Sequence, residues 1–535
     1  MKNKRILSLL LAVTCSLGLV ACGSSTAKDA SSKTSATSTV KKDKIKDGGT
    51  MVFAFGSDPT KLNPYYQENR VTFTVNNALF SPLYLMDSNE TRYYLADKIE
   101  ESKDKLTYTL KLKDNLKWHD GKKITVDDII FSINTIWDEK QNISDREVYL
   151  IGGKKFEMKK IDDLTLQIKL PQVYMPFKGA LGGLRPIPKH VFEGEKDLAK
   201  SEKNNNPVGS GPYKFKEWKK GDHLTLERFN DYFAGKPHIE QVVYKVAGDK
   251  NSSSIAFENG EINATYLSEK KFNTYSKNSK FKTYKYDESM PNYTIFDFKN
   301  RYLAKKEVRQ AICYAINKQD LLKSIFENVE NSKPANSVFP PSTLYYTDKV
   351  EHYDFNLDKA KELMKKANEK DITLKFGYIA GSESDINQFN VIKENLKAIG
   401  INVKPVPLEQ QAFFSQVFGE TPKTFDMTLN AYVCGTDPDS YSGLFVTKGT
   451  MNWANYSNPE LDRIWKTAAI ETDEAKRKEM YETIQKKLAE DAVQYNIDYA
   501  TSMIGVSGNI GGVEEAKTVP IYMFEDLSKL YYVQE

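Results

Sequence analysis

Alternation of apolar and polar residues marks two strands in the first half of the chain. Apolar side chains occupy every second position over 106–112 and again over 164–170, with Thr, Lys, Gln or other polar residues between most of them. A period of two is typical of strands that bury one face. We predict that both segments belong to an antiparallel sheet.

Helical spacing dominates the second half. Apolar residues recur every three or four positions over 308–316, 357–367, 461–468 and 480–488. Asn356 and Asn458 precede two of these segments and are predicted N-caps, and Thr472 or Asp473 caps the last one. We expect these apolar stripes to face the core, so the chain combines both element types in an α/β fold.

The N-terminus has the pattern of an export signal. Lys2, Lys4 and Arg5 precede an uncharged run over 6–20, which is too short and too weakly flanked for a permanent membrane span. The LVACG segment at 19–23 resembles the lipobox of bacterial lipoproteins, which implies lipid attachment at Cys22 after removal of residues 1–21. No other run is long and apolar enough to cross a membrane.

Composition and charge then change. Residues 22–46 are mostly Ser, Thr, Ala and Lys, which cannot bury enough apolar surface to fold, so we interpret them as a lipidated flexible tether. The leader carries three positive residues, and residues 22–47 contain three more Lys than Asp, so residues 1–47 contribute a charge of +6. The whole chain has a formal net charge of +4. The remaining body is therefore at −2, too balanced for a nucleic-acid partner.

Candidate metal and catalytic chemistry is sparse. The five histidines show no metal-ligand spacing, and no phosphate loop, H-E-x-x-H helix or G-x-S-x-G elbow is present, so we expect no cofactor and no metal. Cys313 and Cys434 leave two possibilities open, a disulfide or two free buried thiols. Paired acids for glycoside hydrolysis have no sequence signature, so a surface-anchored hydrolase or adhesin stays an alternative.

Two long motifs carry a family resemblance. They are LTYTLKLKDNLKWHDGKKITVDDIIFSINTIW at 106–137 and NPVGSGPYKFKEWKKGDHLTLERFNDYFAGKP at 206–237, followed in order by shorter matches such as VRQAI at 308–312, DPD at 437–439 and YSNPE at 456–460. Together they resemble extracellular solute-binding protein family 5, the peptide- and nickel-binding lipoproteins of ABC importers, and within it the oligopeptide-binding proteins.

The resemblance implies a two-lobed periplasmic-binding-protein-like fold of the cluster C type with an extra inserted domain. On that pattern, residues 47–84, 206–290 and 501–535 form lobe I, residues 85–205 the inserted domain, and residues 291–500 lobe II. Chain crossings near 290 and 500 are expected to form the hinge.

Several motif residues have structural explanations. We expect Gly209 and Gly211 to supply unusual backbone dihedrals in a tight turn, and the segment 119–121 to form a turn before Ile124. Arg309 is predicted to pair with a buried carboxylate rather than with a ligand.

The resemblance also implies a set of ligand-binding residues. Tyr432 lies six residues after Asp426, where peptide-binding relatives carry an aromatic residue, and its backbone neighbours Ala431 and Val433 belong to the same wall. The opposite wall follows the LNP motif at 62–64. The predicted ligand contacts are Ala431, Tyr432, Val433 and Asp437 on lobe II, Glu68, Asn69, Arg70 and Tyr266 on lobe I, and Tyr149 in the inserted domain.

One departure from the family changes the expected ligand chemistry. Short-peptide binders carry an acid just before the acidic-Pro pair, where it binds the α-ammonium of the peptide, but Cys434 and Gly435 occupy this place here. With this departure, the resemblance implies an oligopeptide ligand, delivery to an ABC transporter permease without enzyme activity, a monomer, and an anchored position at the extracytoplasmic face of the cell membrane. An oligosaccharide or a nickel chelate is the alternative ligand.

Overall fold

A computed structural model describes residues 45–67, 69–87, 90–247, 250–417, 422–433 and 435–534. The predicted leader, the lipidation site Cys22 and all but the end of the tether lie outside the described residues, as do Glu68 and Cys434. Cys313 is buried with a free thiol.

Both predicted strands exist and are neighbours. β6 (Thr107–Leu112) pairs antiparallel with β8 (Thr165–Lys169), with Tyr108 opposite Ile168 and Leu110 opposite Leu166. These four side chains are buried. β5 (Ala96–Glu101) and β7 (Glu157–Lys160) complete a sheet in the order β5-β6-β8-β7. The period of two is therefore confirmed.

The predicted helices are confirmed with their caps. Asn356 caps α9 (Leu357–Ala367), Asn458 caps α13 (Pro459–Ala468), and Asp473 rather than Thr472 caps α14 (Glu474–Glu490). In each case the side-chain oxygen accepts from a backbone N–H of the first turn, which stabilises the helix end. The other helices of at least seven residues are α1 (Arg70–Leu79), α2 (Val126–Trp137), α3 (Phe177–Gly183), α5 (Lys250–Glu258), α6 (Glu269–Tyr275), α7 (Lys306–Ala315), α8 (Lys318–Ile325), α10 (Glu383–Lys397) and α11 (Gln410–Val417).

A mixed ten-stranded sheet runs through the molecule. Its order is β15-β14-β16-β13-β17-β12-β2-β11-β10-β9. The strands are β2 (Thr50–Phe55), β9 (Tyr213–Lys219), β10 (His223–Arg228), β11 (Gln241–Val246), β12 (Ala264–Tyr266), β13 (Phe281–Phe296), β14 (Ile372–Ile379), β15 (Ile401–Leu408), β16 (Met427–Ala431) and β17 (Gln494–Ser507). The remaining strands that the structure describes are short and lie in small two- and three-stranded sheets.

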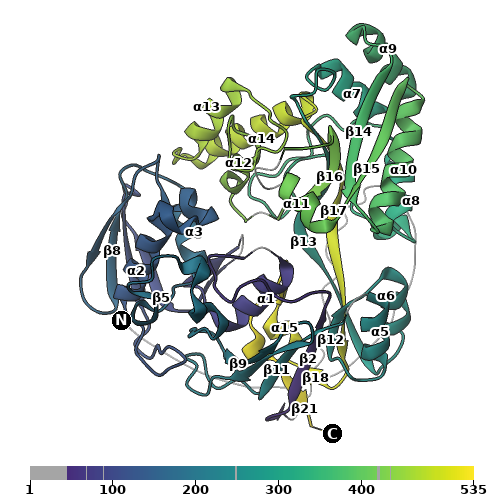
Figure 1. The fold of residues 1–535 in the computed structure, drawn as a ribbon. Helices are drawn as coiled ribbons and strands as arrows, with labels where there is room; N and C mark the ends of the chain where they lie inside the picture. The colour runs from purple at the N-terminus through teal and green to yellow at the C-terminus, as the bar shows by residue number, and fades with distance from the viewer. Residues whose placement is uncertain are drawn as a thin grey trace, which may run out of the picture. The chain divides into compact units, whose positions relative to one another are not determined.

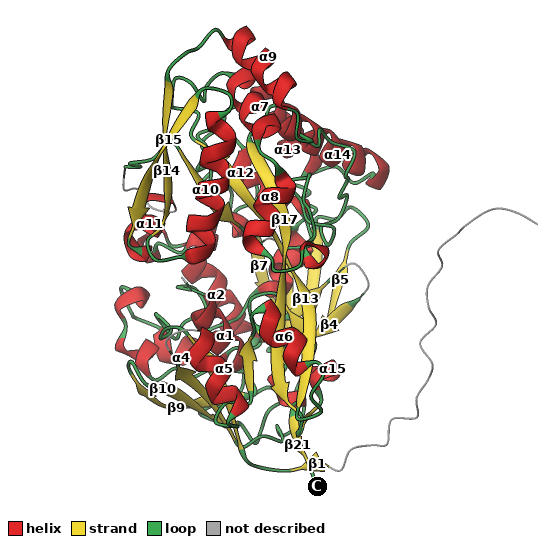
Figure 2. Ribbon diagram, turned by 90° about the vertical axis from the view of Figure 1, so that its right-hand side faces the viewer, coloured by secondary structure: helices red, strands yellow, loops and turns green. Residues whose placement is uncertain are grey.

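Two long strands connect the lobes. β13 and β17 pair antiparallel from Phe281 opposite Ser507 to Ile295 opposite Gln494, and Figures 1 and 2 show them as the long strands that run through both halves of the ribbon. The register shifts between Asp287 and Pro291, and Ser289 between them has a φ of +50°. This irregularity interrupts regular pairing, and irregularities of this kind bend a strand and increase its local twist.

The buried apolar residues form separate clusters on the two sides of this β13–β17 irregularity. Two apolar clusters contain residues from 51–275 and 504–530, and two others contain residues from 293–497. The fold is thus two-lobed. The largest cluster contains buried residues of β6 and β8 together with buried residues of β2, β10 and β11. The residue boundaries of the three parts stay a prediction.

The two motif glycines are structural, but the predicted reason was wrong. Neither Gly209 nor Gly211 has a positive φ. A Cβ on Gly209 would lie 2.0 Å from the carbonyl oxygen of Leu79, and one on Gly211 would lie 2.2 Å from that of Ala78. Both glycines are needed because the loop packs directly against the C-terminus of α1.

The partner predicted for Arg309 was also wrong. Its guanidinium donates to backbone carbonyls of Leu303, Ala304, Asp491 and Ala492 rather than to a buried carboxylate. It therefore ties the end of α14 to the start of α7 through carbonyl groups that the helix end leaves unpaired.

The predicted turn at 119–121 is present, since the Gly121 N–H donates to the carbonyl of Trp118.

Candidate functional site

A cavity of 560 Å³ brings together segments that are far apart in the sequence. Four segments form most of its wall: residues 54–57 at the end of β2, residues 69–71 at the start of α1, residues 265–267 at the end of β12, and residues 501–503 of β17. Ser253 and Gln410 complete the described lining. All of these except Gln410 belong to the parts predicted as lobe I, whereas Gln410 begins α11 in the part predicted as lobe II. The cavity therefore contains residues from both predicted lobes, and ligand pockets occur preferentially at boundaries of this kind.

Arg70 is the charged centre of this cavity. Its Nη1 donates to Oε1 of Glu288 at 3.0 Å, to the Tyr266 hydroxyl at 3.2 Å and to the Ile521 carbonyl at 3.5 Å. The Glu288 side chain is 2% exposed, whereas that of Arg70 is 36% exposed. Burial pulls the pKa of Arg70 down, but Tyr266 and Glu288 outweigh it and hold the pKa above its ordinary value. The guanidinium is therefore a fixed cation at the cavity wall.

Two other predicted residues line the same wall. The Tyr266 ring lies under the Arg70 guanidinium, 5.3 Å from ring centre to Cζ, and its hydroxyl donates to the Ile521 carbonyl at 3.4 Å. Burial raises the pKa of Tyr266. The Asn69 side chain caps α1 by accepting from the Thr72 N–H at 2.9 Å, which positions Arg70 as the first helical residue. The structure thus brings Asn69, Arg70 and Tyr266 together.

The predicted lobe II wall is a separate group. Ala431 ends β16, where it pairs with Asn292 of β13. The half-buried Tyr432 follows, with its ring edge-to-face with Trp453 at 5.9 Å, and Val433 is also half-buried. These three residues are not among the described residues that line the cavity. Their partial exposure leaves surface for a ligand, and the role stays a prediction.

Two predicted ligand-contact residues, Tyr149 and Asp437, form hydrogen bonds within the protein. Tyr149 is 6% exposed within the large core, and its hydroxyl donates to the Ala180 carbonyl at 3.1 Å. Asp437 caps the short helix after it and accepts from Nη2 of Arg477 at 2.9 Å through both carboxylate oxygens. Neither side chain lines the cavity among the described residues, and the ligand-binding role of both stays a prediction.

Sequence reasoning missed a contact between the parts predicted as inserted domain and lobe II. The Tyr174 hydroxyl donates to Oδ2 of Asp439 at 2.7 Å, and the Met175 N–H donates to the Ala469 carbonyl at 2.8 Å. Burial raises the pKa of Asp439 to about 6.

Glu288, Gln410 and Thr501 were also missed, because no motif or periodicity distinguishes a cavity wall from other strand and helix ends.

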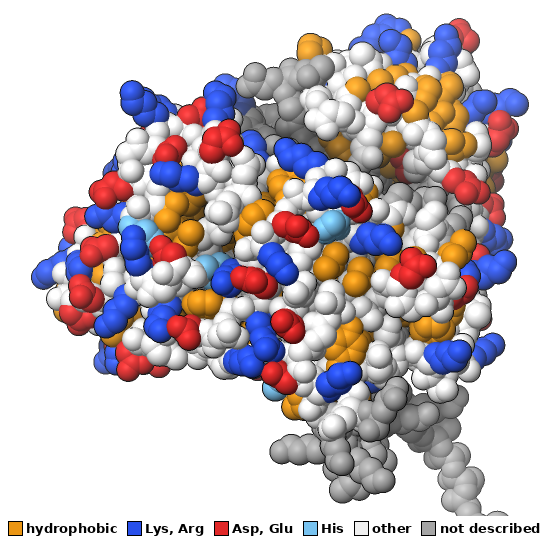
Figure 3. All heavy atoms as spheres, turned by 60° about the horizontal axis from the view of Figure 1, so that its bottom comes forward, with side chains coloured by type: hydrophobic (Ala, Val, Ile, Leu, Met, Phe, Trp, Pro, Cys, Tyr) orange, Lys and Arg blue, Asp and Glu red, His pale blue; other side chains and the backbone are white. Residues whose placement is uncertain are grey.

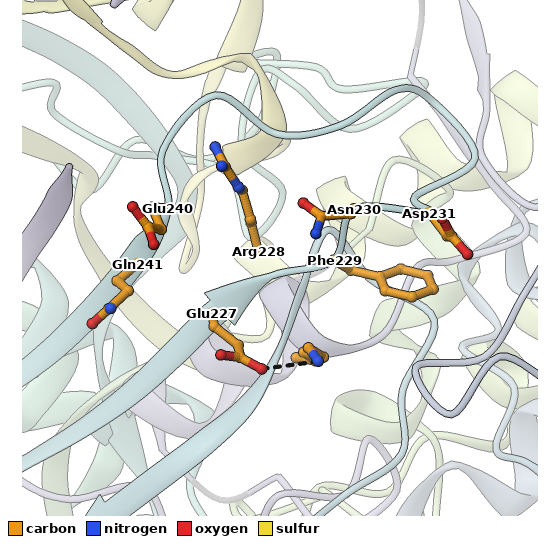
Figure 4. Close-up of a pocket in the computed structure, with 8 residues that line it drawn as sticks. Glu227, Arg228, Phe229, Asn230, Asp231, Glu240 and Gln241 are labelled. Atoms are coloured by element: carbon orange, nitrogen blue, oxygen red, sulfur yellow. Dashed lines mark ion pairs between the residues drawn. The ribbon is translucent and has the colours of Figure 1, made fainter. Parts of the chain in front are cut away.

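A second hollow of 420 Å³ lies within lobe I, around the end of β10 and the start of β11 (Figure 4). Several of its charged groups are paired with one another or with neighbours. Lys214 lies 2.8 Å from Glu227, and Nη1 of Arg228 lies 3.2 Å from Oδ1 of Asp47. This hollow contains no residue from the part predicted as lobe II.

Surface charge and metal chemistry are unremarkable over the described part of the chain. Positive and negative side chains are interspersed on the face shown in Figure 3. Within the described ranges no cluster of three or more His, Cys, Asp or Glu could hold a metal ion. None of the helices that the structure describes has the length and apolar character to cross a membrane.

Comparisons with known proteins agree on one family. The family model described as bacterial extracellular solute-binding proteins, family 5, middle, matches residues 90–453. The oligopeptide-binding protein AppA of Bacillus subtilis is 28% identical over 557 aligned residues, which cover 98% of this chain and 99% of AppA.

Solved structures show the same fold. The ABC transporter substrate-binding protein CtaP of Listeria monocytogenes superposes with a TM-score of 0.85 at 37% identity, covering 91% of this chain and 100% of CtaP. The Bacillus subtilis AppA structure in complex with a nonapeptide superposes with a TM-score of 0.82 at 26% identity, covering 92% of this chain and 100% of AppA.

Proposed function

Since this chain belongs to family 5 of the bacterial extracellular solute-binding proteins, we propose that it captures oligopeptides outside the cytoplasm and delivers them to the permease of an ABC importer. The observation that carries the proposal is the cavity between the parts assigned to the two lobes, in a fold that superposes on a nonapeptide complex over nearly the whole chain.

Binding proceeds by closure of the lobes over the peptide, with no covalent chemistry. A ligand that contacts both walls binds the closed form better and shifts the population toward it. The irregular β13–β17 pairing near Ser289 supplies a place to bend. Asn69, Arg70 and Tyr266 form one wall, and Tyr432 with the backbone of Ala431 and Val433 forms the other.

Main-chain hydrogen bonds supply most of the affinity. A peptide bound in extended form satisfies its own N–H and C=O groups on the protein backbone, while its side chains occupy loose pockets. This mode suits a protein that accepts many sequences. Glu68 lies outside the described residues and stays a predicted contact.

The anchor is a separate part of the proposal. We propose that the mature protein begins at Cys22, carries a diacylglyceryl group there, and works as a monomer at the extracytoplasmic face of the cell membrane. Support comes from the LVACG segment behind a short apolar run and from a following tether of 25 residues without a core-forming pattern.

Native mass spectrometry of the purified mature protein tests the function directly. We expect added masses that fit a series of peptides, each released on unfolding. A stripped protein that binds no member of a mixed oligopeptide library, but binds a saccharide or a metal chelate, contradicts the proposal. Turnover of any library member contradicts its non-enzymatic part.

A further inference from the structure

Arg70 is the one charged side chain among the described residues that line the cavity. The others are small, apolar, hydroxyl or amide side chains. No described lining residue is an acid. A ligand that places a charged group in this cavity therefore meets a cation and no described anion on the wall itself.

The guanidinium is held by one end. All of its hydrogen bonds to described residues use Nη1, and they run to acceptors on three separate segments, Tyr266, Glu288 and Ile521. Nε and Nη2 make no hydrogen bond to the described residues. These two nitrogens form a planar pair of parallel donors, the arrangement that binds both oxygens of a carboxylate.

The ion-pair partner of Arg70 is Glu288, and both of its carboxylate oxygens accept further hydrogen bonds in the interior. Oε1 of Glu288 also accepts from the Ser502 hydroxyl, and Oε2 accepts from the Ile521 N–H at 3.0 Å. Since Glu288 is 2% exposed and Arg70 is 36% exposed, the negative end of the pair faces the interior and the positive end faces the cavity. The pair orients Arg70 without covering its outer edge.

The start of α1 adds a charge of the same sign. Arg70 is the first residue of a ten-residue helix whose first turn contains no acid. The N-terminus of a helix carries a partial positive charge that favours anions within about one turn. Asn69 satisfies one backbone N–H there, and the helix field and the guanidinium act together on a negative group in the cavity.

We infer that Arg70 binds a carboxylate of the peptide, through Nε and Nη2, and that the protein therefore selects peptides that place an anionic group at this wall. The carboxylate comes either from the C-terminus of the peptide or from an acidic side chain. This inference rests on the proposed peptide-binding function and names the feature of the peptide that the cavity recognises.

Titration calorimetry on stripped full-length protein tests it with matched ligands. Pentaalanine is compared with pentaalanine amide, and a set of pentaalanine amides with one Glu is compared with the same set carrying Gln. We expect the wild type to prefer one anionic form over its neutral counterpart by at least about tenfold. Preference for the free acid assigns the C-terminal carboxylate, and preference for a Glu position assigns a side chain.

Variants identify the group responsible. Arg70→Gln is expected to reduce the preference to less than about threefold, and Arg70→Lys to leave an intermediate preference because it keeps the charge but loses the paired donors. Arg228→Gln, which removes a guanidinium from the hollow in Figure 4, serves as the matched control and is expected to keep the full preference.

A purely structural role for Arg70 gives a different pattern. Arg70→Gln then weakens acid and neutral peptides equally, which overturns the inference. Equal binding of the anionic and neutral forms in every one of these ligand pairs by the wild type also overturns it, and this measurement does not depend on whether a variant folds. Failure of every peptide to bind contradicts the proposed function instead, so the two failures are distinguishable.

Discussion

The hydroxyl of Tyr174 donates to the buried carboxylate of Asp439 at 2.7 Å, although the two residues are 265 positions apart. Tyr174 lies just before α3 in the part assigned to the inserted domain, and Asp439 lies after β16 in lobe II. The neighbouring backbone bond from Met175 to Ala469 strengthens the same contact. Because this contact joins the parts assigned to the inserted domain and to lobe II, we expect it to favour the closed form.

Tyr174→Phe should shift the protein toward the open form. A hydrogen bond to a charged acceptor contributes about 1.5–3 kcal/mol net of the lost hydration. We expect a larger radius of gyration for the ligand-free variant in small-angle scattering and peptide binding weaker by about tenfold. Tyr353→Phe, which removes a buried hydroxyl bond to Ala489 within lobe II, is the control. Identical scattering for Tyr174→Phe and wild type argues against this contact as a closing element.

Asp439 should make stability depend on pH. Burial raises its pKa from an ordinary 3.8 to about 6, so the folded protein binds this proton more tightly than the unfolded chain does. The resulting stabilisation is present below about pH 4 and is lost as the pH rises through 6. Asp439→Asn keeps a neutral group, and its Tm should therefore rise relative to wild type between about pH 4 and about pH 6 and stay constant above that range. Calorimetric scans measure this, with exposed Asp114→Asn as control. A pH-independent difference refutes the assignment.

Gly209→Ala should destabilise the fold. Its Cβ would lie 2.0 Å from the Leu79 carbonyl oxygen, and overpacking of this kind costs about 3 kcal/mol or more. We expect a Tm several degrees lower by calorimetry. Gly179→Ala in α3 has no atom within 4 Å of the new Cβ and should be neutral or stabilising. Equal effects of the two substitutions contradict the close-packing explanation.

N-acetylation of a peptide ligand should have little effect. Asp437 is bonded to Arg477, and Asp439 is buried against Tyr174 and Tyr481, so neither acid after the Cys434 position is available for an α-ammonium. We expect acetylation to weaken binding by less than about tenfold, or 1.4 kcal/mol. Calorimetry on a free and acetylated pair measures it. A loss of about a thousandfold indicates that one of these acids rearranges to bind the ammonium.

Cys22→Ala should release the protein from the membrane. A single acyl chain binds membranes reversibly, so retention requires at least the two chains of a diacylglyceryl group. Cell fractionation and fatty-acid labelling are expected to find the variant in the medium or as unprocessed precursor. Normal processing, labelling and retention of Cys22→Ala are incompatible with the proposed anchor.

Local features were predictable because they depend on neighbouring residues. The alternation at 106–112 and 164–170 determines which faces of β6 and β8 are buried, and side chains such as Asn356 and Asn458 cap helices through bonds to backbone only two or three residues away. The ordered motifs likewise identified the family, because each is a contiguous segment. For these elements the sequence by itself was sufficient.

Contacts between distant segments were decided only by the tertiary structure. Arg70 and Glu288 are 218 residues apart, and no periodicity relates them. Gly209 is required by a carbonyl of α1, Arg309 binds carbonyls of a helix end, and Tyr149 is buried in a core shared by two parts of the chain. Local patterns determine which face of an element is apolar, but the partner across that face depends on how all the elements pack, so only the folded chain shows which side chains line the cavity.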